Sequence, residues 1–182
     1  MKKVLAIAAA LVMAFAATAA FAEEPAKMTF TGGVMYNMDM DQVTELLKAI
    51  EGMPTPEIDK ELARGGIEFW ELEYENIKSY DGFTADAKYI FVGNSLVAIH
   101  YDFAKGTSYD EVKKQLTASY GEAVPFNAAQ IGNGKYAIDD DGEVKDCREM
   151  IVADGAIFVL EQDDDGDVDV TILDPAAAYL FS

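Results

Sequence analysis

Alternating apolar and polar residues predict strands along much of the chain. Between residues 67 and 75, Trp70, Leu72 and Tyr74 alternate with glutamates. Because successive side chains of a strand point to opposite faces of a sheet, this segment predicts a strand with one buried and one solvated face. Similar patterns between turn residues predict further strands at 28–35, 86–92, 96–103, 144–152, 156–162 and 167–173.

The clearest hairpin turns around Gly93-Asn94-Ser95. A two-residue turn would pair Lys88 with Ile99 and mix apolar and polar side chains on both faces. A three-residue turn collects the apolar side chains on one face, and a slip of one residue would invert every side chain. The three-residue register is therefore favoured, and it places Lys88, His100 and Asp102 together on the opposite face.

The segment after residue 39 has the spacing of an amphipathic helix. Asp39 can cap the first turn, and Gln42, three residues on, can bond back to the cap. Gly52 ends the segment. The apolar residues that recur at helical spacing between these signals are Val43, Leu46, Leu47 and Ile50.

A second capping pattern predicts another helix. Ser108 and Glu111 stand three residues apart, as Asp39 and Gln42 do. The helix that follows has an apolar stripe of Val112 and Leu116 and closes at Gly121.

A short third helix is expected between these two. Pro56 suits the first position of a helix, where its missing N–H group has no intrahelical partner to lose. Ile58 and Leu62 lie four residues apart, on one helical face, and Gly65-Gly66 stops the segment.

Together these elements predict the α+β class. We expect an antiparallel sheet of about six or seven strands, with two or three helices packed on one face, in a single domain at 23–182. The two capped helices match at positions 69 residues apart, and about three strands follow each. This pattern favours a duplicated helix-plus-three-strand unit, with half-repeats at 28–105 and 106–174. The alternative is that any two capped amphipathic helices share such residues.

The order of elements resembles the β-lactamase-inhibitor-protein-like tandem-repeat fold and its secreted bacterial relatives. The resemblance rests on Gly33, on the helix at Asp39–Leu47, on the strand-turn-strand at Tyr89–Phe103 and on Ser108–Gly121, and it covers most of the mature chain. It implies a sheet whose open face binds a protein. The inhibitor is disulfide-bonded, whereas this chain has Cys147 alone and can form no intrachain disulfide, so inhibitory activity is not implied.

Residues 1–22 have the layout of a secretory signal peptide. Lys2 and Lys3 precede an apolar run at Val4–Phe15, and Ala20-Phe21-Ala22 supplies a small-x-small cleavage site. We therefore expect an exported protein that begins at Glu23 and works in the periplasm or outside the cell. No later apolar run approaches the roughly twenty residues that a transmembrane helix needs, so none is expected in the mature chain.

The chain is strongly acidic. It has 33 acidic and 14 basic residues and a formal net charge of −19. Without Lys2 and Lys3 of the leader, 33 acidic and 12 basic residues give −21. Such a charge repels nucleic acid and anionic lipid headgroups, so no nucleic-acid partner is expected. It suits cationic partners, divalent metals or simple solubility.

The only grouping with acid–base character is His100 with Asp102 and Lys88 on one sheet face. A carboxylate can orient a histidine, but no nucleophile is identifiable, so we assign no catalytic residue. The leading hypothesis is a non-enzymatic module that binds an extracytoplasmic protein or an envelope component. The alternative is a hydrolase that uses carboxylates and His100. The binding face would be lined by Lys88, His100, Asp102, Glu71 and Glu73.

An acidic segment near the C-terminus gives a further alternative. Asp163, Asp165, Asp167 and Asp169 alternate around Gly166, in the way that calcium loops collect oxygen ligands. An EF-hand loop would have Glu where this chain has Asp174, and helices rather than strands would flank it. Two interpretations stay open: a polar hairpin turn with solvated carboxylates, and a weak Ca²⁺ site in a calcium-responsive protein.

Overall fold

A computed structural model describes residues 28–62, 67–78, 82–125, 149–153, 155–163, 165–177 and 180. The signal peptide predicted at 1–22, its cleavage site and Cys147 lie outside the described residues. No helix in the described ranges is long and apolar enough to cross a membrane.

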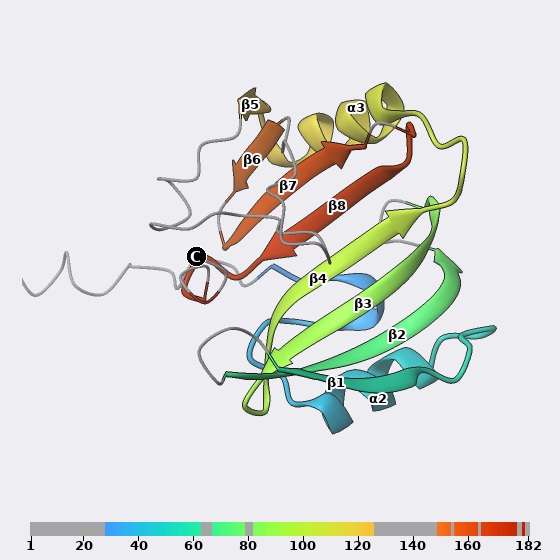
Figure 1. Ribbon diagram of the computed structural model, residues 1–182, viewed down its shortest axis with the longest axis vertical. Helices are drawn as coiled ribbons and strands as arrows, with labels where there is room; N and C mark the ends of the chain where they lie inside the picture. The colour runs from blue at the N-terminus through green and yellow to red at the C-terminus, as the bar shows by residue number, and fades with distance from the viewer. Residues whose placement is uncertain are drawn as a thin grey trace, which may run out of the picture.

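The described residues form one antiparallel sheet of eight strands, in the order β1-β2-β3-β4-β8-β7-β6-β5 (Figure 1). Strands β1 to β4 form one meander, β5 to β8 form another, and β4 pairs with β8 at the centre. The predicted α+β antiparallel sheet is confirmed, but the count of six or seven strands is wrong. The strands are β1 (Glu57–Leu62), β2 (Glu68–Lys78), β3 (Thr84–Val92), β4 (Ser95–Phe103), β5 (Val124–Pro125), β6 (Glu149–Ala153), β7 (Ala156–Gln162) and β8 (Val168–Leu173).

Two α-helices and one short 3-10 helix lie in the described part of the chain: η1 (Thr31–Gly33), α2 (Met40–Lys48) and α3 (Tyr109–Tyr120). The predicted capping box of α2 is confirmed. Asp39 Oδ1 accepts from Gln42 N at 2.8 Å, and Asp39 N donates to Gln42 Oε1 at 3.0 Å. Ser108 also caps α3, because its Oγ accepts from Glu111 N at 3.4 Å, which is one of the two bonds of the predicted capping box.

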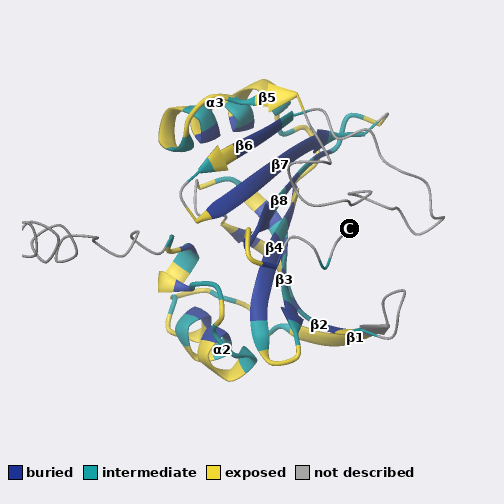
Figure 2. Cartoon of the chain, turned by 90° about the vertical axis from the view of Figure 1, so that its left-hand side faces the viewer, coloured by how far each residue is buried: buried dark blue, intermediate teal, exposed yellow. Residues whose placement is uncertain are grey.

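The inner face of the sheet, defined as the face that the helices cover, holds the main core (Figure 2). Val43 and Leu47 of α2 and Val112 and Leu116 of α3 are buried in it. Directly opposed residues form one inner row from β2 to β6, and every member is fully buried. This inner row is Leu72, Tyr89, Ile99, Ile172, Phe158 and Ile151.

The helices lie over different ends of the sheet. In Figure 1, α3 runs beside β6 and β7, and α2 lies at the end that holds β1 and β2. Tyr109 and Lys113 of α3 both bind Glu149 of β6, and we call these three residues the clamp. Tyr109 Oη donates to Glu149 Oε2 at 2.9 Å, and Lys113 Nζ forms an ion pair with the same oxygen. The hydrogen bond from Lys113 is the main cause that lowers the pKa of Glu149, and Tyr109 adds to it against the opposing effect of burial.

Two predicted elements are wrong. The expected helix after Pro56 is strand β1, in which Ile58 lies opposite Leu72 of β2. Residues four apart share a face in a helix and in a strand, so the spacing of Ile58 and Leu62 did not distinguish the two. The expected strand at 28–35 contains η1 instead, because Gly32 and Gly33 adopt φ values of 71° and 82° that turn the chain.

The β3–β4 hairpin keeps Lys88 beside His100 as predicted, but the predicted three-residue turn is wrong. Val92 pairs with Ser95, so the turn has only two residues, and Gly93 takes a φ of 65°. A β-bulge at Val97 then shifts the register by one residue, so that Lys88 lies opposite His100. The bulge also places Leu96 on the inner face, opposite Phe91.

Candidate functional site

The outer face of the sheet, opposite the helices, carries a row of polar residues across four strands. Glu73 of β2 lies opposite Lys88 of β3, Lys88 opposite His100 of β4, and His100 opposite Thr171 of β8. We call these four residues the polar strip. The register thus brings together three of the five residues predicted for a binding face, and Thr171 joins them.

His100 is held between two groups of β8. Its Nδ1 lies 3.0 Å from Thr171 Oγ1, and its Nε2 lies 4.0 Å from Asp169 Oδ1. The side chain of His100 is 30% exposed and that of Asp169 is 18% exposed. The ring is therefore positioned by the protein while one part of it stays open to a partner.

The other predicted residues lie in the same row as His100 or in the rows next to it. Lys88 Nζ is 3.8 Å from Glu73 Oε2, and both side chains are partly exposed, so this ion pair contributes at most about 1 kcal/mol to stability. Asp102 lies in the next row, where it faces Asp86 on one side and Asp169 on the other. Glu71 lies in the row on the opposite side, facing Ile90.

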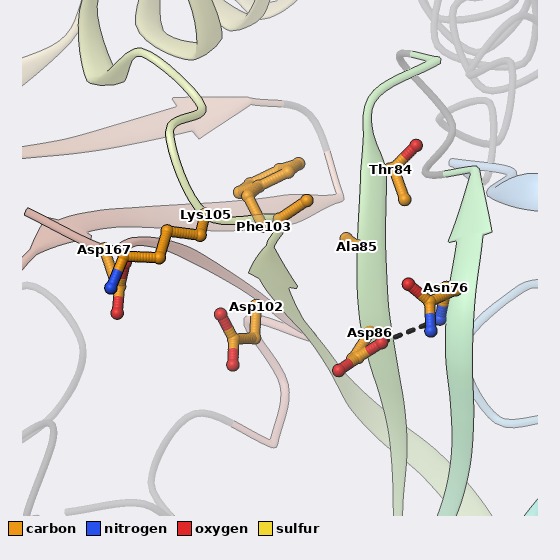
Figure 3. Close-up of a pocket in the computed structure, with 9 residues that line it drawn as sticks. Asn76, Thr84, Ala85, Asp86, Asp102, Phe103, Lys105 and Asp167 are labelled. Atoms are coloured by element: carbon orange, nitrogen blue, oxygen red, sulfur yellow. Dashed lines mark hydrogen bonds between the residues drawn. The ribbon is translucent and has the colours of Figure 1, made fainter.

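A small pocket opens where Asp102 lies. Its volume is about 220 Å³, and Asp86, Asp102, Asp167 and Lys105 line it (Figure 3). Asp86 is positioned by a hydrogen bond to its Oδ1 from Asn76 N at 2.7 Å. Small-molecule sites usually have at least about 300 Å³, so the pocket suits the end of one side chain better than a whole ligand.

In the acidic turn between β7 and β8, the carboxylate of Asp163 stabilises the turn itself. Asp163 Oδ1 accepts from Asp167 N at 2.9 Å, and Gly166 takes a φ of 88°. Asp165 is exposed, Asp167 lines the pocket and Asp169 lies beside His100. Within the described residues, no three His, Cys, Asp or Glu side chains are grouped to hold a metal ion. Each of the four aspartates predicted as metal ligands has different surroundings.

The outer face is open only in part. Beyond the polar strip, Ala98, Ile157 and Leu173 form a second buried cluster with Met150 and Val159. The polar strip thus ends against an apolar region at β7 and β6. The face predicted to be open is exposed mainly over β1 to β4.

A larger cavity of about 680 Å³ lies away from the polar strip. Phe30, Ile50, Met53 and Ile77 are among its lining residues, so it is bounded by the segment before η1, the end of α2 and the end of β2. None of the residues predicted for a site lines it.

Two members of the site had no assigned role toward His100 in the sequence. In the sequence, Thr171 has no signal apart from its position in an alternating strand, and the pattern around Asp169 indicates only a metal ligand. Both reach His100 because β4 pairs with β8, although Thr171 is 71 positions away from His100 in the chain. No local pattern specifies which strands become neighbours.

Comparisons of the chain with protein-family models, with curated proteins and with solved structures found no match. The site is therefore interpreted from its own geometry. Charged and hydrogen-bonding groups stand side by side on four adjacent strands, partly exposed, next to the small pocket lined by three aspartates and Lys105. Such a surface can bind a polar partner with defined orientation.

Proposed function

We propose that the chain is an exported, non-enzymatic binding module that engages a protein or an envelope component through the polar strip. The observation that carries this proposal is the row Glu73, Lys88, His100 and Thr171, whose side chains are held in register by four adjacent strands. Fixed side chains lose little entropy on binding, which favours a specific complex. The signal-peptide pattern supports an extracytoplasmic location.

The small pocket beside the polar strip, called the notch here, indicates the chemistry of the partner. Three carboxylates, those of Asp86, Asp102 and Asp167, outnumber the single ammonium group of Lys105 in a space that fits one lysine or arginine side-chain end. Together with the net charge of −19, this arrangement favours a partner that presents a basic residue.

Affinity capture tests the proposal. The mature protein, residues 23–182, is immobilised and exposed to envelope extract and culture fluid, and bound proteins are identified by mass spectrometry. We expect His100→Ala/Asp102→Ala to lose the partner while keeping the wild-type circular dichroism and melting temperature. Glu122→Ala, an exposed change after α3, is the control and should retain the partner. Equal capture by the folded double variant would remove the polar strip from the binding surface.

A hydrolase is the second candidate, and one contact favours it. Thr171 Oγ1, His100 and Asp169 form a hydroxyl–imidazole–carboxylate series, which is the order of groups in acyl-transfer sites. However, β4 and β8 are interior strands, and their backbone groups form hydrogen bonds with a neighbouring strand on each side. Few backbone N–H groups there can therefore stabilise the oxyanion of an acyl-transfer reaction. Ester hydrolysis that is lost in Thr171→Ala but retained in Thr171→Ser would reverse our preference.

The fold also supports a duplicated unit. A helix precedes each four-stranded meander, and the last strands of the two meanders, β4 and β8, pair with each other. At the offset of 69 residues, the buried Val43 and Leu47 correspond to the buried Val112 and Leu116. We infer a helix-plus-four-strand unit, one strand longer than the sequence suggested, in keeping with the tandem-repeat resemblance.

A further inference from the structure

We propose that the exposed edge of β1 binds an extended polypeptide segment in which basic and apolar residues alternate. The segment would add a ninth strand to the sheet next to β1, at one end of the strand order. This surface borders the polar strip at Glu73, but the inference rests on the edge strand and does not depend on the function proposed for the strip.

The two edges of the sheet differ in what they offer to another strand. Edge strand β5 has two residues, and one of them is Pro125, which has no backbone N–H group to donate. Edge strand β1 has six residues and contains no proline. An edge of this length presents a row of backbone groups that can pair with a further strand.

The described side chains of β1 are all exposed. Glu57, Ile58, Asp59 and Lys60 are each exposed, and Figure 2 shows the strand at the margin of the sheet. Ile58 continues the fully buried inner row, because it lies opposite Leu72, yet it is itself 59% exposed. An apolar side chain from an added strand would extend this row and cover Ile58.

The outer side of the same edge is acidic. Glu57 lies opposite Glu73, and Asp59 lies opposite Glu71, so four carboxylates occupy two adjacent strands. Lys60 points to the inner side, where its Nζ is 2.8 Å from Glu68 and 5.2 Å from the ring centre of Trp70. Basic residues of an added strand would face the carboxylates, and its apolar residues would face Ile58.

The charges also argue against a second copy of this chain as the occupant. In a continuous sheet made by two antiparallel β1 strands related by a two-fold axis, residues of the same face oppose each other. Centring the axis on Ile58 opposes Glu57 to Asp59, centring it on Asp59 opposes Asp59 to itself, and centring it on Lys60 opposes Lys60 to itself. Like charges that face each other directly destabilise such pairs.

Peptides of defined pattern test the proposal by calorimetry. The probe is a capped octapeptide of alternating lysine and valine. The first control has the same composition in two blocks, and the second has N-methyl groups on alternate amides. We expect only the alternating, unmethylated peptide to bind the mature protein. Equal binding of all three peptides would show unspecific charge attraction and overturn the proposal.

Protein variants locate the site. Glu57→Lys/Asp59→Lys should weaken peptide binding at least about tenfold, since two attractive pairs become repulsive. The substitution places opposite charges across from Glu71 and Glu73, so β1 keeps its pairing with β2. Glu122→Lys/Asp165→Lys changes the net charge equally at two exposed positions away from β1, and it should keep binding within about twofold. His100→Ala/Asp102→Ala should also bind the peptide normally, which separates this result from the test of the polar strip.

Hydrogen exchange supplies an independent readout. Peptide binding should slow amide exchange in residues 57–62 more than in any other strand. Protection elsewhere with none in β1 would contradict the proposed edge pairing. Concentration-dependent dimerisation of the wild type without peptide, abolished by Glu57→Lys/Asp59→Lys, would instead assign the edge to a second copy and overturn the proposal.

Discussion

Two neighbouring rows of the same sheet have opposite properties. The inner row from Leu72 to Ile151 is fully buried and apolar apart from one tyrosine, whereas the polar strip, displaced by one residue along each strand, is partly exposed and charged. One residue of displacement reverses the direction of each side chain. We therefore expect substitutions in the inner row to lower the stability of the sheet more than substitutions in the polar strip.

The largest expected effect comes from the inner row. Phe158 is fully buried and stacks on Tyr120 of α3, with ring centres 4.5 Å apart. Phe158→Ala should lower the free energy of unfolding by about 3–5 kcal/mol, measured by urea denaturation. Val152, on the adjacent strand β6 and 60% exposed, is the control, and Val152→Ala should cost less than about 0.5 kcal/mol. Similar losses in both variants would contradict the division between the faces.

A smaller effect is expected at the clamp between α3 and β6. The pKa of Glu149 is lower in the folded state than its usual value near 4.5. The carboxylate therefore stabilises the folded state at pH values above 4.5, and this stabilisation is lost as the pH falls through the lower folded pKa. Glu149→Gln should therefore cost roughly 1 kcal/mol at pH 7, after allowance for partial exposure.

The pH dependence distinguishes this clamp from ordinary packing. The difference in unfolding free energy between the wild type and Glu149→Gln should shrink as the pH is lowered below about 4, measured by denaturation at several pH values. Glu122→Gln, which changes an exposed carboxylate outside the clamp, should show little difference at any pH. A cost of Glu149→Gln that stays constant with pH would attribute it to shape rather than to charge.

The smallest effect on stability is expected in the polar strip. Thr171→Val removes the hydroxyl next to His100 Nδ1 and should change the free energy of unfolding by about 1 kcal/mol or less. Nitrogen chemical shifts of the His100 ring should nevertheless change, because the tautomer depends on that hydroxyl. Thr171→Ser keeps the hydroxyl and should preserve the wild-type shifts. Unchanged shifts in Thr171→Val would mean that groups other than Thr171 determine the tautomer of the His100 ring.

The local patterns predicted the elements that carry strong signals. The caps at Asp39 and Ser108 fix where the two helices begin, because a side-chain oxygen must satisfy backbone N–H groups there. The alternation of Trp70, Leu72 and Tyr74 specifies a strand with one buried face. The segment after Pro56 has too few periodic residues to distinguish a strand from a helix, and its pairing with β2 decides the outcome.

Interactions within a helix or one hairpin are enough to predict the α+β composition, the starts of α2 and α3 and the shared face of Lys88, His100 and Asp102. The pairing of β4 with β8, which places Thr171 and Asp169 at His100, follows only from the assembled fold. The position of β1 at the edge, with Ile58 exposed, is likewise a property of the assembled sheet. Neighbour relations between distant strands depend on the combined packing of the whole core, and no short segment encodes that sum.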